Sequence, residues 1–92
     1  MEVLRVSKGS TDGNGQEFIS IYLEYRLDEQ ERLHRQWVSF LNDHRKQSCH
    51  VSLWSENPHR TPAIQMDKEL GLFKGEVLVE SEAVAFVQSL SL

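Results

Sequence analysis

The chain has 92 residues, of which 39% are hydrophobic and 26% are charged, and its net charge is -4. These values fit one globular domain, 1–92, and exclude a disordered chain. No basic stretch precedes an apolar run at the N-terminus, and no apolar stretch approaches the roughly 20 residues that span a bilayer. The single cysteine, Cys49, excludes an internal disulfide framework, so we expect a cytoplasmic protein without membrane attachment.

A β-hairpin is predicted at the N-terminal end. Residues 1–8 are compatible with a strand, and residues 9–16 contain Asp-Gly and Asn-Gly steps, which favour tight turns. In residues 17–26, apolar side chains alternate with more polar ones, as in a strand with one buried face: Ile19, Ile21, Leu23 and Tyr25. The glycine-rich loop lacks the Gly-Lys-Ser/Thr ending of a phosphate-binding loop.

The strongest helical pattern in the sequence covers residues 27–47. Apolar residues recur at i, i+4, i+7 and i+8: Leu33, Trp37, Phe40 and Leu41. Asp28 has the chemistry of an N-cap, with Glu31 three residues later, and cations follow at the other end: His44, Arg45 and Lys46. The pattern predicts a long central helix whose apolar face covers a sheet.

The C-terminal half is predicted to hold shorter elements. Residues 48–55 read as a strand with Cys49, Val51 and Leu53 on one face and His50, Ser52 and Trp54 on the other. Two prolines make residues 56–62 a loop. Residues 63–66 form a short strand, residues 67–75 form a helical turn or a turn between strands, and residues 76–80 form another strand. Ser81 then caps a final helix over residues 82–89.

Together these elements predict an α+β fold in the order ββαβ(β)βα. It has a mostly antiparallel sheet of four or five strands, with the long central helix and the short C-terminal helix packed on one face.

No group of residues in the sequence has the spacing of a catalytic or metal site. The set His44, Cys49, His50 and His59 matches no zinc template, and neighbours on a strand point to opposite faces. Cys49 follows a predicted helix C-terminus, where the helix dipole opposes a reactive thiolate. The acidic residues lie in caps, strand ends and turns. We therefore expect no enzyme, no catalytic residue, no metal and no cofactor.

The best functional candidate in the sequence is a recognition surface that combines tryptophan, arginine and histidine. We expect it to bind a partner through six residues: Arg45, Lys46, His50, Trp54, His59 and Arg60. The favoured function is a small acidic interaction protein, such as an inhibitor, immunity factor, antitoxin or adaptor, that modulates a larger protein or ribonucleoprotein complex. RNA or DNA binding by region 44–60 is the alternative, and the net charge of -4 disfavours it. A homodimer is also considered, through Phe18 and Tyr22 on the less apolar face of the second strand.

Overall fold

The computed structural model describes residues 3–11, 13, 15–23, 26–27 and 33–90. These residues form strands β1 (Val3–Thr11), β2 (Gln16–Leu23), β3 (Arg26–Leu27), β4 (Leu33–Asp43), β5 (Ser48–Glu56) and β6 (Ile64–Lys74), followed by helix α1 (Glu80–Gln88). The fold is therefore mostly β, with one short helix near the C-terminal end.

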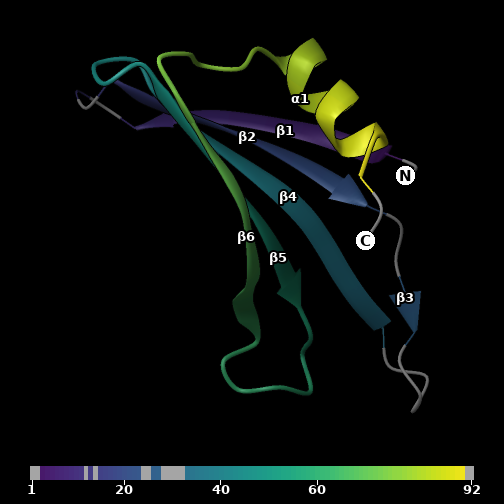
Figure 1. Ribbon diagram of the computed structural model, residues 1–92. Coiled ribbons are helices and arrows are strands. Elements are labelled where there is room, and N and C mark those ends of the chain that lie inside the picture. Colours follow the sequence, from purple (N-terminus) through teal and green to yellow (C-terminus); the bar gives the residue numbers. More distant parts are fainter. Residues whose placement is uncertain (1–2, 12, 14, 24–25, 28–32, 91–92) are drawn as a thin grey trace.

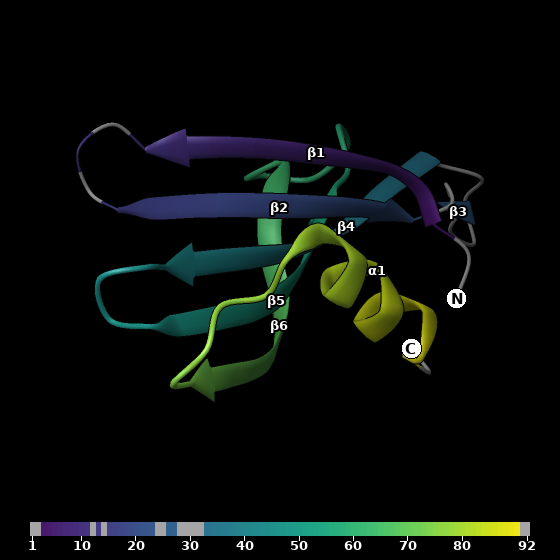
Figure 2. The ribbon, with the colours of Figure 1, turned by 90° about the horizontal axis from the view of Figure 1, so that it is seen from above.

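The strands form an antiparallel meander in the spatial order β1-β2-β4-β5-β6, and the two-residue strand β3 pairs with β4. Figure 1 shows that the sheet is strongly twisted, so that β6 runs across the direction of β1. Seen from above, α1 lies against one side of the sheet (Figure 2). The fold thus has two layers, a sheet and a helix.

The hydrophobic core lies between these two layers. The sheet contributes alternate residues of its three central strands, all fully or almost fully buried: Ile19, Ile21, Leu23, Val38, Phe40, Cys49, Val51 and Leu53. The helix contributes Ala83 and Val87, which are also buried. Phe86 extends this core, because its ring makes T-shaped contacts with Phe40 and Phe73, at 5.6 and 5.8 Å between centroids. The predicted alternation in residues 17–26 and 48–55 is thereby confirmed within the described residues.

The predicted long helix is wrong, and with it the ββαβ(β)βα order. Residues 33–43 form strand β4, residues 44–47 form the turn into β5, and the predicted cap at Asp28 lies outside the described residues. Val38 and Phe40 face the core, while Trp37 and Leu41 face the other way. Trp37, Val38 and Phe40 are also strand-forming residue types, and pairing with β2 and β5 on both sides stabilises the extended form.

The C-terminal half differs from the prediction in three places. Strand β6 runs from Ile64 to Lys74, so it replaces both the short strand 63–66 and the predicted turn in 67–75. Residues 76–79 form no strand. The helix begins earlier than predicted, with Val79 instead of Ser81 as its N-cap, and the Glu82 carboxylate accepts a hydrogen bond of 3.1 Å from the Val79 N–H. The N-terminal hairpin, the strand over 48–55 and the short last helix are confirmed.

Asn42 connects the segment that precedes α1 to the sheet through hydrogen bonds to Leu78. Its side chain is completely buried; Nδ2 donates to the Leu78 carbonyl at 2.7 Å, and Oδ1 accepts from the Leu78 N–H at 3.0 Å. Nδ2 also lies 3.2 Å from Glu17 Oε1. The side-chain amide of Asn42 therefore satisfies both the N–H and the carbonyl of Leu78, as the backbone of a neighbouring strand would otherwise do.

The turn between β4 and β5 is held by Asp43. Its Oδ1 accepts hydrogen bonds of 3.1 Å from the backbone N–H groups of Arg45 and of Lys46. His44 links the turn to the β1–β2 hairpin, because its N–H donates to the Gly15 carbonyl at 2.9 Å. The cations that suggested a helix C-terminus thus belong to a hairpin turn.

The Asp43→Asn variant is expected to make the protein less sensitive to acid. The pKa of Asp43 lies below the ordinary value of 3.8, chiefly because the Lys46 N–H donates to the carboxylate. A carboxyl whose pKa is lower in the folded state contributes stability above its unfolded pKa and loses it as the pH falls through the folded pKa. The free energy of unfolding should therefore fall less steeply below pH 3.8 in the variant than in the parent. Equal slopes in urea titrations across that range would contradict this role.

Candidate functional site

The face of the sheet opposite α1 has no described element packed on it, and we refer to it as the uncovered face. The Cα positions extend over 44 × 27 × 20 Å. Secondary-structure layers pack about 10 Å apart, so the shortest dimension accommodates one sheet and one helix layer. The side chains of the uncovered face are those that alternate with the core residues along each strand.

A row of large side chains crosses the uncovered face from one edge of the sheet to the other. Register places its members side by side on β1, β2, β4, β5 and β6 in turn: Arg5, Tyr22, Trp37, Trp54 and Met66. We call this set the aromatic row. The aromatic row exists because the meander places these five strands next to one another, so that each member of the row lies beside a member on the neighbouring strand.

The members of the aromatic row contact one another. The Arg5 guanidinium lies over the Tyr22 ring, with its central carbon 4.2 Å from the ring centroid. The Tyr22 and Trp37 centroids are 5.7 Å apart, and the two indoles lie nearly parallel, 9° apart in plane with centroids at 6.5 Å. The Trp54 Nε1–H donates to Ser52 Oγ at 2.9 Å. These contacts hold the three rings in fixed positions while leaving them half-buried.

Two further rows lie beside the aromatic row. The serine row is small and polar and ends in an acid at the β6 edge: Ser7, Ser20, Ser39, Ser52 and Glu69. The apolar row follows it toward the β4–β5 turn: Gly9, Phe18, Leu41, His50 and Leu72. Phe18 and Leu41 are each 37% exposed and Leu72 is 56% exposed. A single sheet face therefore presents two bands of large side chains separated by serines.

At position 9 glycine leaves room for the Phe18 ring, which occupies the place where a side chain would begin. A Cβ built on Gly9 would collide with the end of that ring. The far end of the Phe18 ring therefore lies over Gly9 of the edge strand β1. This packing fixes the outer end of the apolar row.

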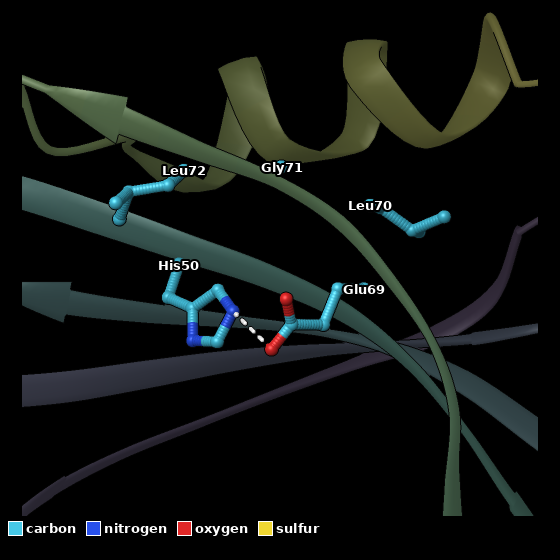
Figure 3. Close-up of a pocket in the computed structure, with 5 residues that line it drawn as sticks. All are labelled: His50, Glu69, Leu70, Gly71 and Leu72. Carbon is cyan, nitrogen blue, oxygen red and sulfur yellow. Dashed lines mark ion pairs between the residues drawn. The ribbon is translucent and has the colours of Figure 1, made fainter.

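An open hollow of about 590 Å³ lies where the uncovered face meets the β6 edge, lined by His50, Glu69, Leu70, Gly71 and Leu72. The imidazole and the carboxylate face each other from neighbouring strands, with His50 Nε2 3.4 Å from Glu69 Oε1 (Figure 3). Strand β6 carries an extra residue at this point, since Val51 pairs with Gly71 while Ser52 pairs with Glu69. The bulge thus shapes the hollow.

The structure brings only part of the predicted recognition surface together. His50 and Trp54 lie on the uncovered face, as their strand phase predicted. Arg45 and Lys46 lie in the β4–β5 turn at one end of β5, whereas His59 and Arg60 lie in the loop at its other end. The six residues therefore do not form one continuous site.

Arg60 has a structural role inside its own loop. Its NH2 group donates to the Ser55 carbonyl at 3.1 Å, to Ser55 Oγ at 2.9 Å and to the Ala63 carbonyl at 3.0 Å. Its NH1 lies 4.0 Å from Asp67 Oδ1. The guanidinium thus ties the two ends of the β5–β6 loop together.

Trp37 and Arg5 belong to the surface although the sequence pattern does not predict them there. The helical pattern predicts Trp37 on a buried face, whereas in β4 it stands between Tyr22 and Trp54 on the uncovered face. The sequence does not predict the contact of Arg5 with Tyr22, because the position of Arg5 beside Tyr22 depends on a register shift between Val3 and Arg5. Tyr22 and Phe18 had been identified as surface candidates, and both lie on this face.

The residues considered for chemistry lie apart. Cys49 is fully buried, and desolvation raises the pKa of its thiol, which disfavours the nucleophilic thiolate. His44 is in the β4–β5 turn, His50 is on the opposite face from Cys49, and His59 is at the far end of β5. In the part of the chain that the structure describes, no three His, Cys, Asp or Glu side chains are grouped to hold a metal ion.

Within the same residues, no helix combines the length and apolar character needed to cross a membrane. No protein-family model matches the chain, and neither the curated proteins nor the solved structures include a match.

Proposed function

We propose that this protein is a non-enzymatic interaction domain that binds a larger partner protein through its uncovered face and thereby modulates or inhibits it. The observation that carries the proposal is the aromatic row, flanked by exposed apolar side chains on a face that no described element covers. Tryptophan, tyrosine and arginine are the residues most enriched at the energetic centres of protein interfaces. The row contains all three types in direct contact.

The rigidity of the row supports this proposal. Stacking fixes the two indoles, and the Trp54 Nε1–H already has a partner in Ser52 Oγ. Binding therefore immobilises few side chains, and such pre-organisation favours affinity. The exposed members Leu41, Met66 and Leu72 extend the apolar area around the rings. Exposed apolar side chains gathered on one face in this way are typical of an interaction site.

The charge on the uncovered face favours a protein partner over nucleic acid. Among the residues that the structure describes, strand phase places as many acids as cations there: Asp43, Glu56 and Glu69 with Arg5, Arg35 and Lys74. Two of the acids also pair locally, because Arg35 lies 3.6 Å from Glu56, and His50 contacts Glu69. Nucleic-acid surfaces usually show an excess of cations. Mixed charge around an apolar centre is instead the composition of a protein interface.

Trp54→Ala is expected to give a folded protein that binds its partner at least about 30-fold more weakly, which corresponds to a loss of about 2 kcal/mol. The measurement is a titration of the captured partner, after a tagged chain has been used to isolate it from the native host. Thermal unfolding of the variant shows whether the fold persists. Unchanged binding by folded Trp54→Ala would mean that another surface is used.

A matched pair of exposed residues provides the control. Leu72 on the uncovered face and Val79 at the start of α1 are each 56% exposed. Leu72→Ser should weaken partner binding, whereas Val79→Ser should leave it unchanged, since serine is also a favourable N-cap. Equal effects of the two variants would argue against the uncovered face.

Binding of single-stranded nucleic acid is the second candidate function, favoured by the line of three aromatic rings. Aligned aromatic side chains on a sheet stack bases in several RNA-binding folds. The test is filter binding of single-stranded RNA and DNA at low and moderate salt, because contacts to phosphates weaken steeply as salt rises. No retention at low salt would exclude this function.

A further inference from the structure

We infer that the uncovered face also binds a second copy of this chain, face to face, about a twofold axis parallel to β4. The inference rests on the proposed function in one respect, since it takes the same face as a protein-binding surface. It adds a specific occupant, a second copy, which must leave before another protein can bind. The resulting dimer has four layers, with two sheets inside and one helix on each outer side.

The area of the face is sufficient for a weak dimer. Five strands at about 4.8 Å spacing and about eight residue steps of 3.3 Å give a patch of about 600 Å² per copy. Two such patches bury on the order of 1,200 Å², the lower limit for specific interfaces. Twisted sheets of the same hand pack face to face at about -30°, so β4 of each copy lies within about 15° of the axis direction. We therefore expect a reversible dimer with a dissociation constant of about micromolar magnitude.

The distribution of charge across the face selects the orientation of the axis. Arg5 lies on the β1 edge and Glu69 on the β6 edge, at opposite ends of neighbouring rows. An axis parallel to β4 places the β1 edge of one copy over the β6 edge of the other, so each Arg5 approaches Glu69 of the second copy. An axis across the strands would instead place Glu69 over Glu69, and like charges repel.

The same orientation brings large apolar groups together. Trp37 lies on β4, the central strand, so the two copies of Trp37 meet close to the axis. Leu72, on the β6 edge, lies over the Phe18 ring that covers Gly9 on the β1 side. The most exposed member of the apolar row therefore gains an aromatic partner, and the serine rows of the two copies face each other between these contacts.

Charge reversal tests the arrangement by analytical ultracentrifugation of the purified full chain over a micromolar concentration series. Arg5→Glu alone and Glu69→Arg alone should each weaken the dimer by at least about tenfold, because each places like charges in contact twice. An equimolar mixture of the two variants should restore dimers, since both contacts then join opposite charges. Lys68→Glu is the matched control: Lys68 neighbours Glu69 on β6 but pairs with the core residue Leu53, and it should leave the dimer unchanged.

Two other outcomes would overturn the inference, and they can be told apart. A parent chain that stays monomeric throughout the series removes the dimer but leaves the proposed function intact if a partner is still captured through Trp54. A dimer unaffected by either charge reversal, or not restored by mixing, forms through a different surface, such as an edge strand. Retention of the fold is checked for every variant by thermal unfolding.

Discussion

Phe40→Ala is expected to lower the free energy of unfolding by about 3–5 kcal/mol, the range for removing a buried phenylalanine. Phe40 is fully buried at the centre of the sheet, and its ring makes a T-shaped contact with Phe86 from the helix. The cavity left by alanine would open between the two layers, where Phe86 would lose an aromatic partner. Domains of this size have about 5–15 kcal/mol of stability, so a measurable fraction of the variant should be unfolded without denaturant. Urea titration followed by circular dichroism measures the change.

Leu41→Ala is the control, and it also separates the strand from a helix. Leu41 is 37% exposed on the uncovered face, so its truncation should cost about 1 kcal/mol or less. In a helix over residues 27–47, positions 40 and 41 would share one apolar face, and both truncations would be severe. A large difference between the two neighbours is expected only from a strand.

Asn42→Ala is expected to cost about 2–4 kcal/mol, although it removes only a small polar side chain. The substitution leaves both backbone groups of Leu78 without the amide partners that they have at 2.7 and 3.0 Å. Leu78 is 6% exposed, so water replaces those partners poorly, and each buried unsatisfied group costs about 1–3 kcal/mol. Hydrogen exchange at Leu78 and in α1 should accelerate more than exchange in β2 and β5. Uniform acceleration would contradict a local clamp.

Asn42→Asp gives the same position a dependence on pH. The introduced carboxylate can still accept from the Leu78 N–H, but it cannot donate to the Leu78 carbonyl, and Glu17 lies close by. Burial and the nearby acid both favour the protonated form of the introduced carboxyl group, so its pKa rises on folding. The stability of this variant should therefore recover as the pH falls and decline as the pH rises. Asn42→Ala should show no such recovery, and its urea titrations provide the comparison.

The sequence predicted those elements whose pattern has one reading. In residues 17–23 and 48–55 the aliphatic residues recur at every second position, and residues 82–89 start after polar residues and repeat with a helical period, so these patterns predict the hairpin, β5 and α1. Residues 37–41 have two readings. Trp37, Phe40 and Leu41 satisfy a helical spacing, while Trp37, Val38 and Phe40 are all strand-forming residues. Pairing with β2 and β5, which lie far away in the sequence, decides between the two readings, and a local pattern cannot contain that information.

For the same reason, the sequence predicts only part of the candidate site. The phase of β5 placed His50 and Trp54 correctly on a surface. The exposure of Trp37 follows from the extended conformation of β4, which the sequence pattern did not predict. The alignment of the aromatic row follows from the registers of four strand pairs, which lie outside any local pattern. The role of Asn42 could not be predicted either. An asparagine in phase with Val38 and Phe40 points to a buried hydrogen-bonding role only if those residues are known to face the core.

The two edges of the sheet differ in a way that limits aggregation. Edge strand β6 carries an extra residue at two places and three consecutive charges at Asp67, Lys68 and Glu69. Both features discourage the addition of another strand. Edge strand β1 has a single register shift near its start and pairs regularly from Arg5 to Thr11. Growth of a continuous intermolecular sheet needs two long receptive edges on each chain, and of the two edge strands described here only β1 offers one. Strand addition at β1 would therefore stop after a single step instead of propagating into a fibre.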